Sequence, residues 1–192
     1  MTAVDRTMSA AIPPSSHAST PASAGDRAGA AAPTSRSLIL DLGALDLSNR
    51  SLGREHIERM NPHRGHMALI DYIVWAADDS TSGVALKRVR DDEFWVAGHF
   101  PGRPMLPGVL MVEAAAQLCV YLFNRRFPVP KTAAFTHIDE CAFRNAVVPG
   151  DDLYLLAREI RATERRFQSS IQGVVNGKIA FDAKIAGMAL GG

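Results

Sequence analysis

Runs of β-branched, aromatic and large apolar residues predict strands in the first half of the folded part of the chain. Residues 67–77 (MALIDYIVWAA) and residues 81–89 form two such runs, and Asp78-Asp79-Ser80 between them is typical of a turn. Residues 94–100 form a shorter segment that is also predicted to be extended. This region is therefore predicted to consist of two strands joined by a turn, followed by a short extended piece.

The segment after Pro107 has the pattern of a buried helix. From Val109 to Phe123, 13 of 15 residues are apolar, and no polar stripe recurs at helical spacing. Proline suits the first helical turn because its missing N–H is not needed there, and Pro128 and Pro130 end the run. We predict one long helix that is covered on nearly all sides, and a shorter helix over residues 54–60.

The C-terminal part is predicted to be a series of strands. The strand-like segments are residues 131–147, 153–161, 167–175 and 178–188, and Asn176-Gly177 separates the last two. Asn-Gly is a strong hairpin signal because a type I′ turn requires positive φ at both central residues. There is no internal repeat, and strands do not alternate regularly with helices. Strands, one long buried helix and then further strands predict an α+β fold, with a curved antiparallel sheet wrapped round a central helix.

Composition supports a globular domain preceded by a different kind of segment. The chain has 192 residues, 47% of them hydrophobic, with a formal net charge of +1 and no Lys/Arg run that would indicate nucleic-acid binding. Residues 1–36 are rich in Ala, Ser, Pro and Thr and are predicted to be disordered, which leaves residues 37–192 as the domain. These 36 residues lack the apolar core of a secretory signal, so we predict a cytoplasmic protein; their Ser-rich, acid-poor composition leaves a transit peptide as the alternative.

Two further features bear on whether the protein is associated with a membrane and on its cellular compartment. The apolar run at 109–123 is too short for a membrane span and contains Glu113 and Gln117, so no membrane association is predicted. Cys119 and Cys141 fit no metal-binding spacing and are predicted to be two buried thiols in a reducing compartment.

Glu113 is the first candidate for chemistry. An ionised carboxylate in an apolar setting is costly, and burial favours its neutral form, which is a plausible proton donor. Gln117 lies four residues later on the same helix face and can hold the carboxyl group or a water molecule. The alternative is a buried acid that backbone groups or a partner subunit satisfy.

His99 is the second candidate. It stands in Gly98-His99-Phe100-Pro101-Gly102, and histidine is the natural general base near pH 7. The N–H groups of Gly108 and Val109, just after Pro107, have no partner within the helix and could stabilise an oxyanion. Base, acid and oxyanion site together suit proton abstraction next to a carbonyl, with loss of a β-hydroxyl.

The segment GHFPGRPMLPGVLMVEAAAQ (98–117) resembles the signature of the 3-hydroxyacyl-(acyl-carrier-protein) dehydratases of type II fatty acid synthesis. The resemblance extends upstream to NPHRGHMALID (61–71) and downstream to IDECAFRNAVVPGD (138–151). Three elements in this order cover roughly residues 54–188.

This resemblance implies a hotdog fold and a dehydratase that needs no cofactor or metal. It assigns His99 as the base and Glu113 as the acid, joined across a homodimer that can assemble further into a trimer of dimers. The substrate would be a (3R)-3-hydroxyacyl thioester on acyl carrier protein. The predicted oxyanion and substrate-binding residues are His63, Phe100, Pro107, Gly108, Val109 and Gln117.

Two rival functions share the fold, namely an acyl thioesterase and a non-catalytic acyl-binding subunit. Among the remaining candidates, His63 and His66 have a weak metal-binding spacing without a third ligand. Arg158, Arg161, Arg165 and Arg166 are either a solvated strand end or a docking site for the acidic carrier protein. Arg103, Arg125, Arg126 and Lys131 are alternatives for that docking role.

Overall fold

The computed structural model describes residues 37–190, and the segment predicted to be disordered, 1–36, lies outside them. The strands are β1 (Leu52–Gly53), β2 (Tyr72–Ala76), β3 (Ser82–Arg88), β4 (Ala133–Phe143), β5 (Asp152–Ala162), β6 (Arg166–Val175) and β7 (Lys178–Ala189). The helices are α1 (Arg54–Met60) and α2 (Gly108–Asn124), with short 3-10 turns η1 (Leu42–Ala44) and η2 (Gly65–Met67).

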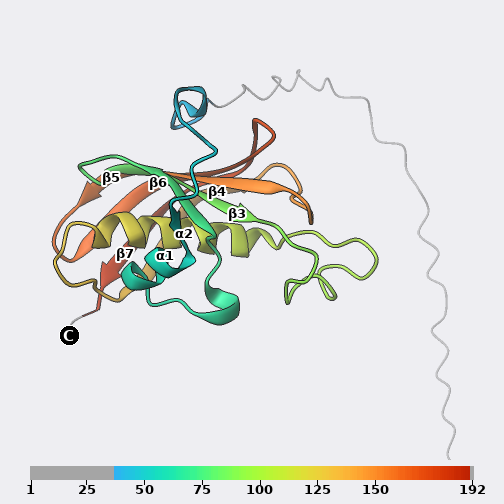
Figure 1. The fold of residues 1–192 in the computed structure, drawn as a ribbon, viewed down its shortest axis with the longest axis horizontal. Coiled ribbons are helices and arrows are strands. Elements are labelled where there is room, and N and C mark those ends of the chain that lie inside the picture. The colour runs from blue at the N-terminus through green and yellow to red at the C-terminus, as the bar shows by residue number, and fades with distance from the viewer. Residues whose placement is uncertain (1–36, 191–192) are drawn as a thin grey trace, which may run out of the picture. The chain divides into compact units, whose positions relative to one another are not determined.

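One antiparallel sheet packs against the long helix α2. The strand order is β1-β2-β3-β5-β6-β7-β4, and α2 lies along one face of the sheet with α1 beside it (Figure 1). Every residue of α2 from Ala114 to Asn124 is buried. The predicted α+β architecture, a sheet wrapped round a central helix, is therefore confirmed.

The segment before β1 covers part of the opposite face of the sheet. Leu40 is buried there with Val74, Val84 and Leu156 in a second, smaller apolar cluster. In Figure 1 this blue segment lies on the side of the strands that faces away from α2. The Gln172 side chain fixes it, because its oxygen accepts from Ile39 N and its nitrogen donates to the Ser37 carbonyl. Leu and Ile residues before residue 50 thus belong to the fold.

Several predicted boundaries are confirmed. The helix at 54–60 has the predicted bounds, and β3, β5, β6 and β7 match the predicted segments to within one or two residues. Asn176 and Gly177 have φ values of 49° and 75°, as a type I′ turn requires. Pro107 is the N-cap of α2 rather than its first helical residue.

Two strand predictions were wrong. Residues 94–100 are a series of turns, with Val96 N–H bonded to the Glu93 carbonyl and His99 N–H bonded to the Trp95 carbonyl. The strand predicted from residue 67 begins at Tyr72, because η2 occupies its start and Leu69 N–H bonds to the Gln117 side chain instead of to a strand. In both places a local or side-chain hydrogen bond replaces the strand ladder.

The thiol prediction was half wrong. Cys119 is buried on α2, where burial raises the pKa of its thiol to about 12, and a hydrogen bond from Ser169 offsets only part of this rise. Cys141 is a free but exposed thiol, because it lies on the edge strand β4.

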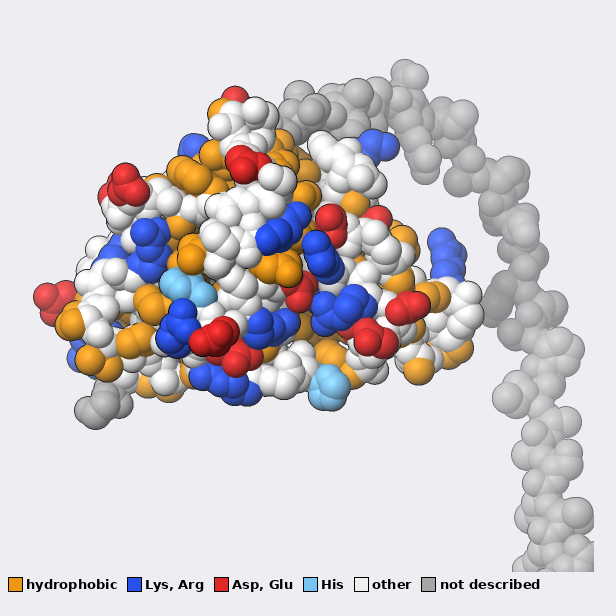
Figure 2. Space-filling model, viewed as in Figure 1, with side chains coloured by type: hydrophobic (Ala, Val, Ile, Leu, Met, Phe, Trp, Pro, Cys, Tyr) orange, Lys and Arg blue, Asp and Glu red, His pale blue; other side chains and the backbone are white. Residues whose placement is uncertain are grey.

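Within residues 37–190 there is no helix long and apolar enough to cross a membrane. The face shown in Figure 2 carries basic and acidic side chains interspersed among hydrophobic ones.

Candidate active site

His99 is held by the loop between β3 and α2. Its ring Nδ1 lies 2.6 Å from the Met105 carbonyl oxygen, and the Met105 N–H donates to the His99 carbonyl at 2.7 Å. Because a carbonyl oxygen only accepts, Nδ1 carries the proton and Nε2 is left with a lone pair. The Phe100 ring stacks on the imidazole, with 4.1 Å between the ring centroids. The loop therefore presents His99 in the tautomer that a general base requires.

The N-terminus of α2 lies beside His99. His99, Pro107, Gly108 and Val109 line one cavity of about 480 Å³, which Phe143 closes on another side. The first helical acceptor, the Pro107 carbonyl, binds the N–H groups of Leu110 and Met111, so those of Gly108 and Val109 come before the helical ladder.

Packing also explains why position 108 is a glycine. A Cβ atom at this position would lie 2.6 Å from the Phe143 ring, so any side chain here would displace that ring. The glycine thus lets an aromatic ring pack directly on the first turn of the helix.

Glu113 is anchored by Gln117. The Gln117 side-chain nitrogen donates to Glu113 Oε1 at 2.9 Å and to the Met67 carbonyl at 2.8 Å, while its oxygen accepts from Leu69 N–H at 3.0 Å. Leu69 N–H fixes the amide orientation, since only the oxygen can accept from it. Gln117 therefore joins the acid to residues 67–69 through a fully used amide.

His63 completes this group. Its Nε2 lies 3.4 Å from Glu113 Oε1, and its Nδ1 is buried without a hydrogen-bond partner in the described part of the chain. Burial lowers the pKa of His63, and the opposing charge of Glu113 does not cancel this effect. His63 is therefore neutral near pH 7 and approaches Glu113 as an uncharged imidazole.

The predicted residues thus form two groups. His99, Pro107, Gly108 and Val109 line the first cavity, whereas His63, Glu113 and Gln117 line a second cavity of about 150 Å³ with Phe135 and Phe167. Phe100 lies beside the first group, stacked on His99 and 49% exposed. Residues 37–190 contain no cluster of three or more His, Cys, Asp or Glu side chains that could hold a metal ion.

Comparison with known proteins assigns the family. The model of the FabA-like domain family matches residues 61–187, which include both groups of site residues. The chain belongs to the FabA-like family. A curated relative, the 3-hydroxyacyl-(acyl-carrier-protein) dehydratase FabZ of Alkaliphilus metalliredigens (strain QYMF), is 41% identical over 119 residues, which are 60% of this chain and 76% of that protein.

Solved structures share the fold of this FabA-like chain. The dehydratase heterocomplex ApeI:P from Xenorhabdus doucetiae superposes with a TM-score of 0.62 at 14% identity, covering 70% of this chain and 91% of that one. A cysteine-to-alanine variant of the HP0420 homologue from Helicobacter felis gives a TM-score of 0.53 at 8% identity, covering 70% and 85%. The fold is the hotdog fold.

Sequence reasoning missed a buried ion pair that supports the His99 loop. Lys87 Nζ on β3 contacts both carboxylate oxygens of Glu93 at 2.8 and 3.0 Å, and their side chains are only 2% and 7% exposed. Glu93 also accepts from Arg90 N–H and the Trp95 indole. Since the Trp95 carbonyl binds His99 N–H, the pair fixes the turns that carry His99. No periodic pattern in the sequence indicates such a pair.

Loss of the Gln117 amide should destabilise the FabA-like domain. We expect Gln117→Met to cost about 1–3 kcal/mol for each buried backbone group left without a partner, here Leu69 N–H and the Met67 carbonyl. Urea denaturation measures this loss. Gln168→Met, a half-buried glutamine on β6, is the matched control. Equal midpoints for the two variants would contradict the anchoring role.

The Lys87–Glu93 pair should make the free energy of unfolding depend on pH in the acidic range. Burial opposes ionisation of Glu93, but hydrogen bonds from Lys87, Arg90 N–H and Trp95, with the charge of Lys87, hold its pKa below 4.5. A lowered folded-state pKa gives stability that is present above pH 4.5 and is lost as pH falls through the folded pKa. The free energy of unfolding, measured from neutral to acidic pH, should therefore fall more steeply for wild type than for Lys87→Met/Glu93→Gln. Parallel pH profiles would refute this.

Proposed function

We propose that this protein is a (3R)-3-hydroxyacyl-(acyl-carrier-protein) dehydratase that forms trans-2-enoyl thioesters in fatty acid or related lipid biosynthesis. The observation that carries the proposal is the presence, inside one FabA-like domain, of both a base-competent His99 and a Gln117-anchored Glu113. The name of the relative from Alkaliphilus metalliredigens supports the same reaction. Both cysteines are free thiols, which fits the cytoplasm.

The elimination divides between the two side chains. His99 Nε2 takes the C2 proton, because Nδ1 is committed to the Met105 carbonyl. The C3–O bond breaks, and the Glu113 carboxyl group donates a proton to the leaving hydroxyl, which departs as water. Gln117 already occupies Glu113 Oε1, so Oε2 is the oxygen that faces the substrate. The reaction needs no cofactor.

The start of α2 would stabilise the enolate. Negative charge develops on the thioester oxygen when C2 loses its proton, and the N–H groups of Gly108 and Val109 are free to bind it. One such donor is worth roughly 3–4 kcal/mol in the transition state. The Phe143 ring packs against Gly108 at this end of the helix.

The base and the acid would meet across a homodimer. Within one chain they line separate cavities, so a complete site calls for a second copy. At the edge of the described sheet, β4 pairs with β7 on one side, and its Phe135, Ile138 and Phe143 are 39%, 51% and 52% exposed. An apolar edge strand is a natural pairing surface, and further assembly into a trimer of dimers remains part of the proposal.

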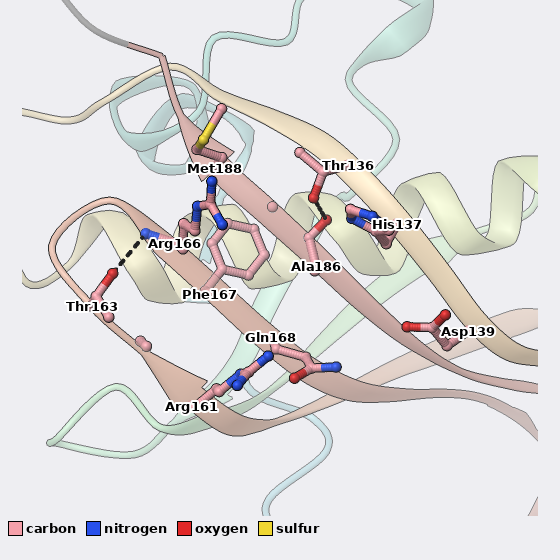
Figure 3. Close-up of a pocket in the computed structure, with 12 residues that line it drawn as sticks. Thr136, His137, Asp139, Arg161, Thr163, Arg166, Phe167, Gln168, Ala186 and Met188 are labelled. Carbon is pink, nitrogen blue, oxygen red and sulfur yellow. Dashed lines mark hydrogen bonds between the residues drawn. The ribbon is translucent and has the colours of Figure 1, made fainter.

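The acyl carrier protein would dock at the arginines of the β5–β6 hairpin. Arg158, Arg161, Arg165 and Arg166 are exposed, and none forms an ion pair within residues 37–190. Two of the rival cations are engaged, because Arg126 pairs with Glu159 and Lys131 donates to the Glu164 carbonyl. Figure 3 shows Arg161 and Arg166 on one side of a groove on the sheet. Uncompensated arginines suit an acidic protein and the phosphate of its prosthetic arm.

Hydration of crotonyl-carrier protein tests the reaction and the shared site together. His99→Ala and Glu113→Gln should each lower the rate by about 10²–10⁴-fold, the usual worth of a general acid or base. Mixing the two inactive variants after dissociation and reassembly should restore part of the activity, because a heterodimer holds one intact site. Absence of wild-type hydration, with release of free thiol instead, would favour a thioesterase. No recovery on mixing would place both residues of a site in one chain.

Docking is tested by comparing two substrates. Arg161→Gln/Arg166→Gln should raise KM for crotonyl-carrier protein by about tenfold or more at low salt, since electrostatic steering contributes on this scale. KM for the crotonyl thioester of N-acetylcysteamine, which has no phosphate or protein, should not change. Arg59→Gln, an exposed arginine paired with Glu55 on α1, is the control. Equal effects on both substrates would exclude the docking role.

A further inference from the structure

The loop after α1 holds His63 from both sides. Before it, the Asn61 side-chain nitrogen donates to the Gln117 carbonyl at 2.8 Å, which ties the loop to α2. After it, Arg64 Nη1 donates to the carbonyls of Asn61 and His63 at 2.7 and 2.8 Å. The other terminal nitrogen of this guanidinium donates to the Glu58 carbonyl at 2.7 Å. Because the guanidinium is a rigid planar fork, three carbonyls bound to it fix the backbone that carries the imidazole.

The imidazole of His63 turns its Nε2 toward the acid. Nε2 lies 3.4 Å from Glu113 Oε1, the oxygen that already accepts from the Gln117 amide at 2.9 Å. An oxygen that accepts from the amide is the one without the carboxyl proton, so the group that faces it is a donor. Burial lowers the pKa of His63, the charge of Glu113 raises it in part, and that of Arg64 lowers it. The neutral ring therefore carries its proton on Nε2, whereas His99 carries it on Nδ1.

Glu113 becomes an anion in the proposed elimination, because its carboxyl group gives a proton to the leaving hydroxyl. Between residues 37 and 190 no lysine or arginine pairs with this carboxylate. Its partners are two uncharged donors, the Gln117 amide and the His63 ring, and both face Oε1. Donors to an ionised oxygen form shorter and stronger hydrogen bonds than donors to a neutral one. Negative charge on Glu113 should therefore shorten the 3.4 Å contact.

We propose that His63 is a positioning residue for the acid, which holds Glu113 Oε1 through its Nε2–H and stabilises the carboxylate that forms during the reaction. The inference rests on the proposed function and adds a residue that the elimination as described above does not use. With the amide and the imidazole both on Oε1, the transferred proton is kept on Oε2, on the substrate side. His63 itself gives up no proton and stays neutral throughout.

The tautomer of His63 tests the contact without depending on turnover. The ¹⁵N chemical shifts of the imidazole at neutral pH should show Nε2–H for His63 and Nδ1–H for His99, with the His63 signals assigned by their loss in His63→Gln. Replacing Glu113 by Gln should lower the pKa of His63, since the charge of Glu113 raises it. Glu55→Gln, an exposed acid on α1, is the matched control and should leave that pKa unchanged. An Nδ1–H tautomer at His63, or equal shifts for the two variants, would overturn the contact.

Rescue by a shorter donor separates positioning from packing. His63→Leu fills the site without a donor and should lower kcat for hydration of crotonyl-carrier protein by about 10–100-fold, the usual worth of a hydrogen bond to a charged group, with KM unchanged. His63→Gln, whose amide nitrogen can take the place of Nε2, should recover most of this loss. Equal kcat values for the two variants, in proteins with the same thermal midpoint, would show that the ring only packs.

Arg64→Met reaches the same contact from an exposed side chain, which guards against misfolding of His63→Leu. Release of the loop carbonyls should lower kcat, and the double variant with His63→Leu should lose little more than His63→Leu alone, because both changes remove one interaction. Losses that multiply would contradict the proposal. Wild-type protein that hydrates no crotonyl thioester would sink the dehydratase function instead, and the His63 tautomer would still decide the contact.

Discussion

The burial of α2 against the sheet is the constraint on which the rest of the structure depends. A helix covered from Ala114 to Asn124 cannot leave a polar side chain without partners. Gln117 meets this condition by using both donors and its acceptor, and in doing so it joins Glu113 to the loop after α1. The same hydrogen bonds that make the buried amide tolerable therefore orient the acid. The hydrogen bonds of Gln117 thus serve both the stability of the fold and the geometry of the site.

The helix also separates the two halves of the chemistry. Its N-terminus, with Gly108, lies beside His99, whereas Glu113 comes more than one turn later and lines a different cavity. A straight helix cannot bring both ends of such a segment to one point. The exposed apolar edge strand β4 gives a physical reason for a second chain to approach. In the proposed homodimer, the division of base and acid between chains would follow from the same packing that makes the core.

Much of the fold could be predicted from the sequence, because the signals for its helices and turns are local. The apolar run 109–123 gives the helix, and Asn176-Gly177 gives the last hairpin. The turns at 94–100 could not be predicted, because they depend on a pair between Lys87 on β3 and Glu93 in the loop, which no periodicity reveals. The Met105 carbonyl that sets the His99 tautomer was missed for a similar reason, since a backbone acceptor leaves no mark on residue type.

Two glycines connect the fold to both cavities in the same way. At Gly108 and Gly187 the absence of a Cβ lets the rings of Phe143 and Phe167 pack directly on the backbone. A larger residue at either position would displace a ring that lines a cavity, although neither glycine needs a positive φ. The size of the residue opposite each ring thus decides whether the cavity wall is closed. Access to the site is set by backbone packing as much as by the side chains that carry the chemistry.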